Sequence, residues 1–226
     1  MSKKLFQFDA QIRKEKKIKI ICGIDETGRG CWAGPLVAAS VIFHPEDFID
    51  GLDDSKKLSN KQRLNLDEKI KSTCLSWAIS EIQVDEIDKK GINFANSQAM
   101  KNSAILAAQK INLKLEEIDF FIIDQSPCKS LNPYMMIPKA DSKSASVAAA
   151  SILAKNHRDA IIKEMSDVYP NYEFSRHNGY INNVHVDVVN SFGLIDGIHR
   201  KSFIVSGYNK PKQLSLMEIL NENTNF

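Results

Sequence analysis

The stretch from Ile18 to Gly30 constrains the fold most, because an apolar run ends there in two adjacent acids. Its sequence is IKIICGIDETGRG. The β-branched residues of this run favour a buried strand over residues 18–24. Taking an unpaired carboxylate out of water is costly, so a buried Asp25 or Glu26 has to be paired, metal-bound or protonated. Taken alone, the stretch equally allows an ordinary strand end whose acids face water.

A second short apolar segment, residues 118–123, also ends in an acid, Asp124. Further segments predict strands at 34–43, entered through a Gly-Pro turn, and at 74–84. They also predict helices at 59–71, 84–88, 93–110, 144–165 and 184–191, and an irregular connection at 127–138. Strands that alternate with helices favour an α/β fold with a central mixed sheet. Ligands in such sheets bind beyond the carboxyl ends of the strands. If the two acid-ended strands are neighbours, three carboxylates converge at one edge of the sheet.

The charge distribution suggests how the 226 residues divide. Residues 1–20 hold seven basic and two acidic residues, although the whole chain carries a net charge of only +2. We predict a basic N-terminal tail at 1–17, a catalytic domain at 18–206 and a C-terminal tail at 207–226. The basic arm allows either a polyanionic partner or a tail that only aids solubility.

Other compositional features narrow the class of protein. The sequence contains no run of eighteen apolar residues, so we expect no membrane span. We also recognise no secretory signal. The four cysteines, Cys22, Cys31, Cys74 and Cys128, show no C-x-x-C spacing. They predict reduced thiols rather than a zinc site or a disulfide framework. We therefore expect a cytoplasmic protein that does not interact with membranes. We also expect it to be a monomer.

Four acids form the candidate site: Asp25, Glu26, Asp124 and Asp141. Close carboxylates repel one another and stay ionised together only when a cation compensates them. Hard divalent ions with oxygen ligands, Mg²⁺ or Mn²⁺, are suited to this task. A pair of such ions can activate water and stabilise the leaving oxygen of a phosphodiester. For Asp141, a role as a cap near a helix N-terminus is the alternative.

Several sequence blocks occur in an order that resembles the ribonuclease HII family. They span Ile18 to Phe203 and comprise residues 23–30 (GIDETGRG), 33–39 (AGPLVAA), 54–58 (DSKKL), 122–124 (IID), 139–142 (KADS), 150–155 (ASILAK) and 177–180 (HNGY). A lone GRG would be weak evidence, whereas the ordered set is specific. The resemblance implies a ribonuclease H-like fold, with a central mixed sheet flanked by helices and a C-terminal helical portion.

The resemblance also implies an activity. Members hydrolyse the RNA strand of RNA–DNA hybrids with divalent metal ions. They also cleave on the 5′ side of single ribonucleotides embedded in duplex DNA, which leaves 3′-hydroxyl and 5′-phosphate ends. The implied substrates are therefore RNA–DNA hybrids and ribonucleotide-containing duplex DNA, and the implied cofactor is Mg²⁺ or Mn²⁺.

Roles follow from the resemblance position by position. Asp25, Glu26 and Asp124 match the metal ligands, and Asp141 matches a fourth catalytic acid. The remaining matches concern substrate: Gly28, Arg29 and Gly30 for the turn at the 2′-hydroxyl, Tyr180 for the sugar at the RNA–DNA junction, and Lys56 and Lys139 for phosphates. Close backbone approach suits glycine, and the 2′-hydroxyl distinguishes RNA from DNA. Either lysine could instead be an ordinary solvated loop residue.

Some residues are expected to support the structure rather than the chemistry. Asp159 is predicted to stabilise a helix through a salt bridge. His177, His185 and His199 could serve as bases, but two-metal hydrolysis does not require one. Gln125, Cys31-Trp32 and Asn182 depart from the usual family pattern, and none of them replaces a catalytic carboxylate.

The C-terminal tail contains a short motif, Gln213 to Met217 (QLSLM). It is similar to the pentapeptide with which bacterial repair proteins dock on the sliding clamp, which usually ends in phenylalanine. Short apolar peptides can fill a groove on a partner in this way. The alternative is a helix that docks on its own domain.

Two rival functions remain open at this point. A ribonuclease HIII-type enzyme shares the chemistry, but typically carries an extra N-terminal domain and a GTG-like turn instead of one with Arg29. A non-catalytic nucleic-acid-binding module would not need four acids, which repel phosphate unless metals are bound. Cleavage of a duplex with one ribonucleotide, with and without EDTA, separates these possibilities.

Overall fold

The computed structural model describes residues 1–124 and 127–209. Within this part of the chain, five strands form one mixed sheet in the order β3-β2-β1-β4-β5. The strands are β1 (Ile21–Thr27), β2 (Leu36–Ile42), β3 (Ser76–Ile82), β4 (Phe120–Ile123) and β5 (Tyr134–Met136). β2 pairs antiparallel with β1 and β3, whereas β4 pairs parallel with β1 and β5. The predicted α/β fold with a central mixed sheet is confirmed.

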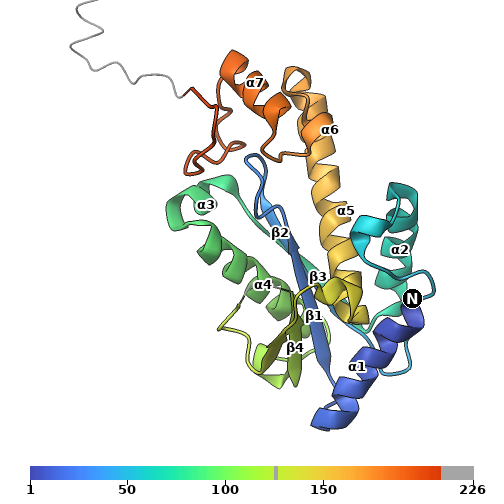
Figure 1. Ribbon diagram of the computed structural model, residues 1–226. Helices are drawn as coiled ribbons and strands as arrows, with labels where there is room; N and C mark the ends of the chain where they lie inside the picture. Colours follow the sequence, from blue (N-terminus) through green and yellow to red (C-terminus); the bar gives the residue numbers. More distant parts are fainter. Residues whose placement is uncertain (125–126, 210–226) are drawn as a thin grey trace, which may run out of the picture.

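Helices cover both faces of the sheet (Figure 1). One face carries α3 (Val84–Lys90) and α4 (Ile92–Gln109), and the other carries α2 (Asn60–Thr73) and α5 (Ala145–Val168). Every residue of β2 is buried, because a central strand covered on both sides must be apolar on both sides. The small residues at the start of α5 let this helix approach β1 closely at Gly23, where an added Cβ would collide with Ser146.

The predicted helix starts are confirmed by their caps. Ser59 and Gln62 form a capping box at the start of α2, in which each side chain binds the other residue's backbone N–H. The Ser144 side chain accepts a hydrogen bond from the Val147 N–H at the start of α5. Both caps satisfy N–H groups that a helix cannot pair internally.

The prediction of a tail at residues 1–17 is wrong, because helix α1 (Ser2–Lys16) packs on the domain. Leu5 and Ile12 are buried on its inner face. The Asp9 carboxylate accepts hydrogen bonds from the backbone N–H and the hydroxyl of Ser146, at the first turn of α5. The Arg13 guanidinium donates to the carbonyl of Phe43. Two apolar and two polar residues therefore hold α1 on the domain. The many basic residues of this segment made it resemble an exposed tail in the sequence.

Two strands also differ from expectation. β1 begins at Ile21 and runs through Thr27, so Asp25 and Glu26 lie inside the strand and pair with β2. β4 stops at Ile123, opposite Ile24. The connection predicted as irregular contains β5, a three-residue edge strand beside β4. Short edge strands carry little sequence signal, since few residues are involved.

The C-terminal portion caps the sheet near the turn between β1 and β2. It contains the 3₁₀ turn η4 (Pro170–Tyr172) and the helices α6 (Phe174–His177) and α7 (Asn183–Phe192), which confirms the predicted C-terminal helical portion. Three further 3₁₀ turns are η1 (Ser55–Lys57), η2 (Leu115–Glu117) and η3 (Ala140–Ser142). The motif at 213–217 lies outside the described residues. None of the described helices is long and apolar enough to cross a membrane.

Candidate active site

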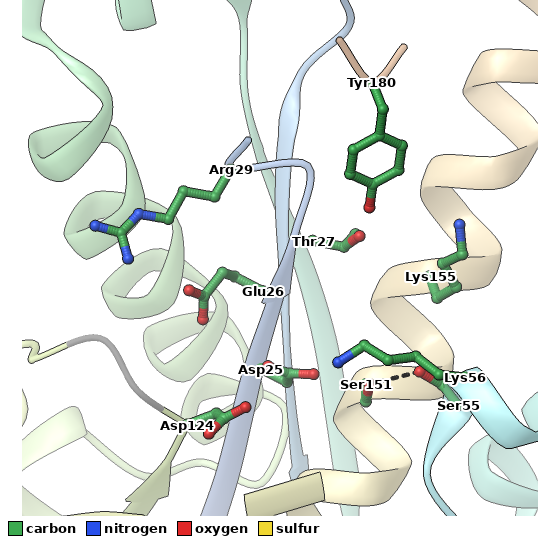
Figure 2. A pocket seen from close by; sticks show the side chains of 10 residues that line it. All are labelled: Asp25, Glu26, Thr27, Arg29, Ser55, Lys56, Asp124, Ser151, Lys155 and Tyr180. Atoms are coloured by element: carbon green, nitrogen blue, oxygen red, sulfur yellow. Dashed lines mark hydrogen bonds between the residues drawn. The ribbon is translucent and has the colours of Figure 1, made fainter. Parts of the chain in front are cut away.

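A cleft of about 310 Å³ opens at the end of the sheet where β4 stops and β1 continues. It brings together side chains from five separate segments of the chain (Figure 2). They are Asp25, Glu26, Thr27, Arg29, Ser55, Lys56, Asp124, Ser151, Lys155 and Tyr180. Six of the ten residues predicted to bind metal or substrate line this cleft.

The sheet register explains why three of the acids meet. Ile24 pairs with Ile123, so Asp25 and Asp124 follow at the same level on neighbouring parallel strands. Successive side chains of a strand point to opposite faces, and β1 therefore directs Asp25 toward α5 and Glu26 toward α4. All three carboxylates reach the cleft because β4 ends here (Figure 2).

The protein environment clearly destabilises the charged form of Asp25. Its side chain is buried, and burial together with the nearby charge of Glu26 raises its pKa well above the ordinary value. Asp124 and Asp141 add to the repulsion, while a hydrogen bond from Ser151 counteracts it. A carboxylate in this position gains stability when a cation arrives.

Asp141 joins the acids from a different direction. It is buried on η3, and its carboxylate lies 3.7 Å from the ammonium of Lys56 on η1. Burial and the neighbouring Asp54 raise the pKa of Asp141, and Lys56 opposes them. Partial burial works against the charge on Lys56, but Asp141 and Asp54 outweigh it and raise the lysine pKa. The backbone N–H of Ala140 donates to the Asp124 carboxylate and links η3 to the end of β4.

We call Asp25, Glu26, Asp124 and Asp141 the acidic floor. Among the residues that the structure describes, no three metal-binding side chains are grouped closely enough to hold an ion as they stand. The donor set nevertheless fits a hard divalent ion, since it consists of carboxylate oxygens that repel one another, three of them in the cleft and that of Asp141 beside it.

The turn after β1 forms the other side of the cleft. Gly28 has φ +87°, a conformation that favours glycine, and a Cβ there would lie 2.5 Å from Nε of Arg158. Gly30 borders open space. The Arg29 guanidinium donates a hydrogen bond to the side-chain oxygen of Asn93 at the start of α4.

Two buried arginines hold this turn. The Arg158 guanidinium, from α5, donates to the carbonyls of Ala33, Pro35 and Asn178. The Arg200 guanidinium donates to the carbonyls of Gly34 and Arg29. Both side chains are fully buried, and burial lowers the pKa of Arg200 to about 10.

Tyr180 completes the cleft from the loop between α6 and α7. The residue is 44% exposed, and the Arg158 guanidinium lies 5.9 Å from the centre of its ring. Its backbone forms an antiparallel bridge with Cys31, and the Gly179 carbonyl accepts from the backbone N–H of Trp32. We call residues 28–30 and 178–180, with Arg158 and Arg200, the loop corner.

The remaining predicted residues lie differently. Lys139 is exposed with φ 57° ahead of η3 and does not line the cleft. Asp159 forms the predicted salt bridges, with Lys155 at 2.6 Å and with Arg63 at 3.1 Å. Lys155 itself lines the cleft and was not predicted.

Sequence reasoning also missed the two serines of the cleft and the two buried arginines. Ser55 and Ser151 lie in the cleft wall with their hydroxyls 2.9 Å apart. Arg158 was detectable, because it stands four residues after Ala154 and four before Ile162, on the buried stripe of α5. A charged residue in an apolar stripe indicates a buried polar contact.

Comparison with known proteins agrees with this geometry. A family model described as Ribonuclease HII matches residues 22–205. The chain is 43% identical over 187 residues to a protein named Ribonuclease HII from Dechloromonas aromatica, covering 82% of this chain and 91% of that protein.

Solved structures show the same fold. A Bst ribonuclease HIII in complex with Mn²⁺ aligns with a TM-score of 0.66 and 18% identity, over 82% of this chain and 67% of that one. A ribonuclease HII from Archaeoglobus fulgidus, solved in complex with PCNA, aligns with a TM-score of 0.64 and 23% identity, over 82% and 96% of the two chains. The chain belongs to the ribonuclease HII family, whose members are ribonuclease H endonucleases that cleave the RNA of RNA–DNA hybrids.

Proposed function

We propose that this protein is a metal-dependent endoribonuclease that acts on RNA–DNA hybrids and cleaves 5′ of single ribonucleotides embedded in duplex DNA. The products would carry 3′-hydroxyl and 5′-phosphate ends. The observation that carries the proposal is that one cleft contains three acids of the floor, Asp25, Glu26 and Asp124, together with the side chains of Arg29 and Tyr180. An enzyme for this substrate needs a site for phosphodiester hydrolysis next to a site that senses the ribose.

The acidic floor would hold Mg²⁺ or Mn²⁺ through Asp25, Glu26 and Asp124, with Asp141 as the fourth acid. When bound, such ions supply positive charge that activates water and stabilises the leaving oxygen. Lys56, already 3.7 Å from Asp141, would bring a further positive charge to the scissile phosphate. Lys139 would contact a phosphate farther along the strand, since it lies outside the cleft.

The loop corner would select the substrate. The backbone at Gly28–Gly30 would approach the 2′-hydroxyl, and the exposed ring of Tyr180 would pack on the neighbouring sugar. A deoxyribose at this position lacks the hydroxyl and would leave polar backbone groups unpaired, which costs binding free energy. Recognition of this kind requires a rigid loop, and the hydrogen bonds from Arg158 and Arg200 provide that rigidity.

Cleavage of three duplexes tests the proposal directly. One carries a single ribonucleotide, one carries a long RNA strand and one is all DNA, and each is incubated with Mg²⁺, with Mn²⁺ and with excess EDTA. We expect cuts 5′ of the single ribonucleotide, none in the all-DNA duplex and none with EDTA. No cleavage by the folded protein in either metal would favour a non-catalytic binding module, and cleavage of the long hybrid alone would favour an activity of the ribonuclease HIII type.

A partner can also be proposed for the C-terminal motif at Gln213–Met217, which lies outside the described residues. The similar ribonuclease HII from Archaeoglobus fulgidus forms a complex with PCNA. We propose that the tail docks this enzyme on a sliding clamp. Failure of both the full chain and the tail peptide to bind purified clamp would refute this. Action as a cytoplasmic monomer remains a prediction from the sequence.

A further inference from the structure

Three histidines lie buried behind Tyr180, outside the cleft. His177, His185 and His199 are each at most 3% exposed. The rings of His177 and His185 stack with their centres 3.9 Å apart. Trp32, Tyr172 and Phe174 surround them with aromatic rings. Buried polar groups in such surroundings need complete hydrogen bonding, and the contacts of these rings show how it is achieved.

A chain of hydrogen bonds runs from Ile195 to Tyr180 through two of the rings. The backbone N–H of Ile195 lies 2.9 Å from Nδ1 of His199. Nε2 of His199 lies 3.1 Å from Nε2 of His185, and Nδ1 of His185 lies 2.9 Å from the Tyr180 carbonyl oxygen.

Both ends of this chain dictate the same placement of protons. At one end a backbone N–H can only donate, so Nδ1 of His199 accepts and the proton of its neutral ring is on Nε2. At the other end a carbonyl can only accept, so Nδ1 of His185 carries the proton and its Nε2 accepts. The two assignments are compatible, because the Nε2–H of His199 can donate to the unprotonated Nε2 of His185. If either ring took up a second proton, two N–H groups would face each other and one hydrogen bond would be lost.

The third ring holds the preceding residue in the same way. Nδ1 of His177 accepts from the backbone N–H of Gly179, so its proton is on Nε2, which donates to the Tyr172 carbonyl. Burial lowers the pKa of all three rings, to about 3 for His185 and about 4 for His199. The neutral forms that the hydrogen bonds demand are therefore the forms present at neutral pH.

Tyr180 is half-exposed at the cleft. Its side chain interacts with the Arg158 guanidinium, which lies 5.9 Å from the ring centre, and with the Cys31 thiol. Its direction depends on the backbone, whose N–H donates to the His177 carbonyl and whose carbonyl accepts from His185. We propose that His185 and His199 are positioning residues, which aim the Tyr180 ring at the substrate through a chain of two neutral imidazoles of defined tautomer.

This inference rests on the proposed function only for the role of Tyr180 at the sugar. The tautomers can be measured without any activity. In ¹⁵N-labelled protein at pH 7, two-bond ¹H–¹⁵N correlations should show the Nδ1–H tautomer for His185 and the Nε2–H tautomer for His177 and His199. An Nε2–H tautomer of His185, or an imidazolium at either end of the chain, would overturn the proposal even if the enzyme cleaves as expected.

Matched substitutions at His185 test the positioning role. His185→Asn keeps an amide donor near the place of Nδ1, whereas His185→Gln moves it to the place of Nε2. With a single-ribonucleotide duplex, we expect His185→Gln to lose about as much kcat/KM as Tyr180→Ala, and His185→Asn to retain activity within about threefold of the parent. The double variant Tyr180→Ala/His185→Gln should be no worse than Tyr180→Ala alone.

A purely structural role predicts other results. His185→Asn and His185→Gln would then lose equal activity, or the double variant would show the product of the two single losses. Either outcome would overturn the proposal. Unfolding curves for each variant give the folded fraction, so that activity is compared per folded molecule. If the parent protein cleaves nothing, the proposed function fails and the tautomer measurement still tests the chain.

Discussion

The acidic floor and the loop corner lie on two sides of one cleft, yet their energetics are opposite. The floor gathers carboxylates that repel one another, and it raises the pKa of Asp25 and Asp141. The corner places two fully buried guanidinium groups where backbone carbonyls satisfy them. We therefore expect the floor to need a cation that compensates its charge, whereas the corner is already organised in the free protein. Substitutions in the floor should cost activity, and substitutions in the corner should cost stability as well.

The largest effect is expected for Asp25→Asn. Loss of one metal-holding carboxylate should reduce kcat by about 10³-fold or more in a single-ribonucleotide cleavage assay. Without divalent ions, the same variant should be as stable as the parent or more stable by about 1 kcal/mol, because a buried, repelled charge is removed. Asp124→Asn should likewise lose most activity, and the exposed Glu116→Gln serves as control. Full activity of folded Asp25→Asn or Asp124→Asn would refute the metal assignment.

The two glycines of the turn sharpen the comparison. Gly28→Ala should lower the free energy of unfolding by about 2–4 kcal/mol, because φ is positive and the new Cβ meets Arg158 and the Pro35 carbonyl. Gly30→Ala should change it by less than about 0.5 kcal/mol, since its Cβ would face open space. Both variants should lose cleavage if the backbone approaches the 2′-hydroxyl. Equal stability of the two in urea unfolding would show that the corner is less rigid than we infer.

Because of His185 and His199, the contribution of the corner to folding stability should depend on pH. The folded-state pKa values, about 3 for His185 and about 4 for His199, lie below the ordinary 6.5. The unfolded chain therefore binds more protons as pH falls below 6.5, so the pair's contribution is complete above that pH and is lost toward pH 4. Among the described residues, His177 is the other titratable group that acts on both rings.

This dependence is measurable by difference. Between pH 7 and pH 4.5 the parent should lose about 2 kcal/mol more unfolding free energy than His185→Asn, which cannot take up a proton there. Guanidinium unfolding at the two pH values measures the difference. A parent and variant with parallel pH profiles would contradict the buried, neutral state of His185.

The smallest effect is expected at the exposed rim. Lys56 is 81% exposed at its side chain and forms an ion pair with Asp141 of the floor. Lys56→Ala should raise KM about threefold to tenfold and reduce the slope of log KM against log salt by about one. The exposed Lys61→Ala on α2 is the matched control. A loss of 10³-fold in kcat for Lys56→Ala would instead place this lysine in the acidic floor's chemistry.

Most of the sheet and the floor could be predicted because their signals are local. Apolar runs ending in acids located β1 and β4, and the ordered family blocks identified the four carboxylates. The convergence of Asp25 and Asp124 required the register of Ile24 against Ile123, which no local pattern contains. The floor was therefore predictable in composition but not in geometry.

The corner was harder to predict, because its residues act through backbone groups distant in sequence. The Arg200 guanidinium donates to the carbonyl of Arg29. The His185 ring binds the carbonyl of Tyr180. Helix α1 was missed for a similar reason, since Asp9 caps α5 across 137 residues. Charged and polar residues in such roles look like solvated surface until the tertiary contact is known.

Calorimetric titration of Mn²⁺ into the metal-free protein tests the contrast between floor and corner most directly. We predict that the parent and Tyr180→Ala bind Mn²⁺ with affinities within about threefold of each other, because the tyrosine belongs to the corner. Asp25→Asn should bind at least about tenfold more weakly, since a ligand of the floor is lost. Equal binding by Asp25→Asn and the parent, or a loss confined to Tyr180→Ala, would contradict the account.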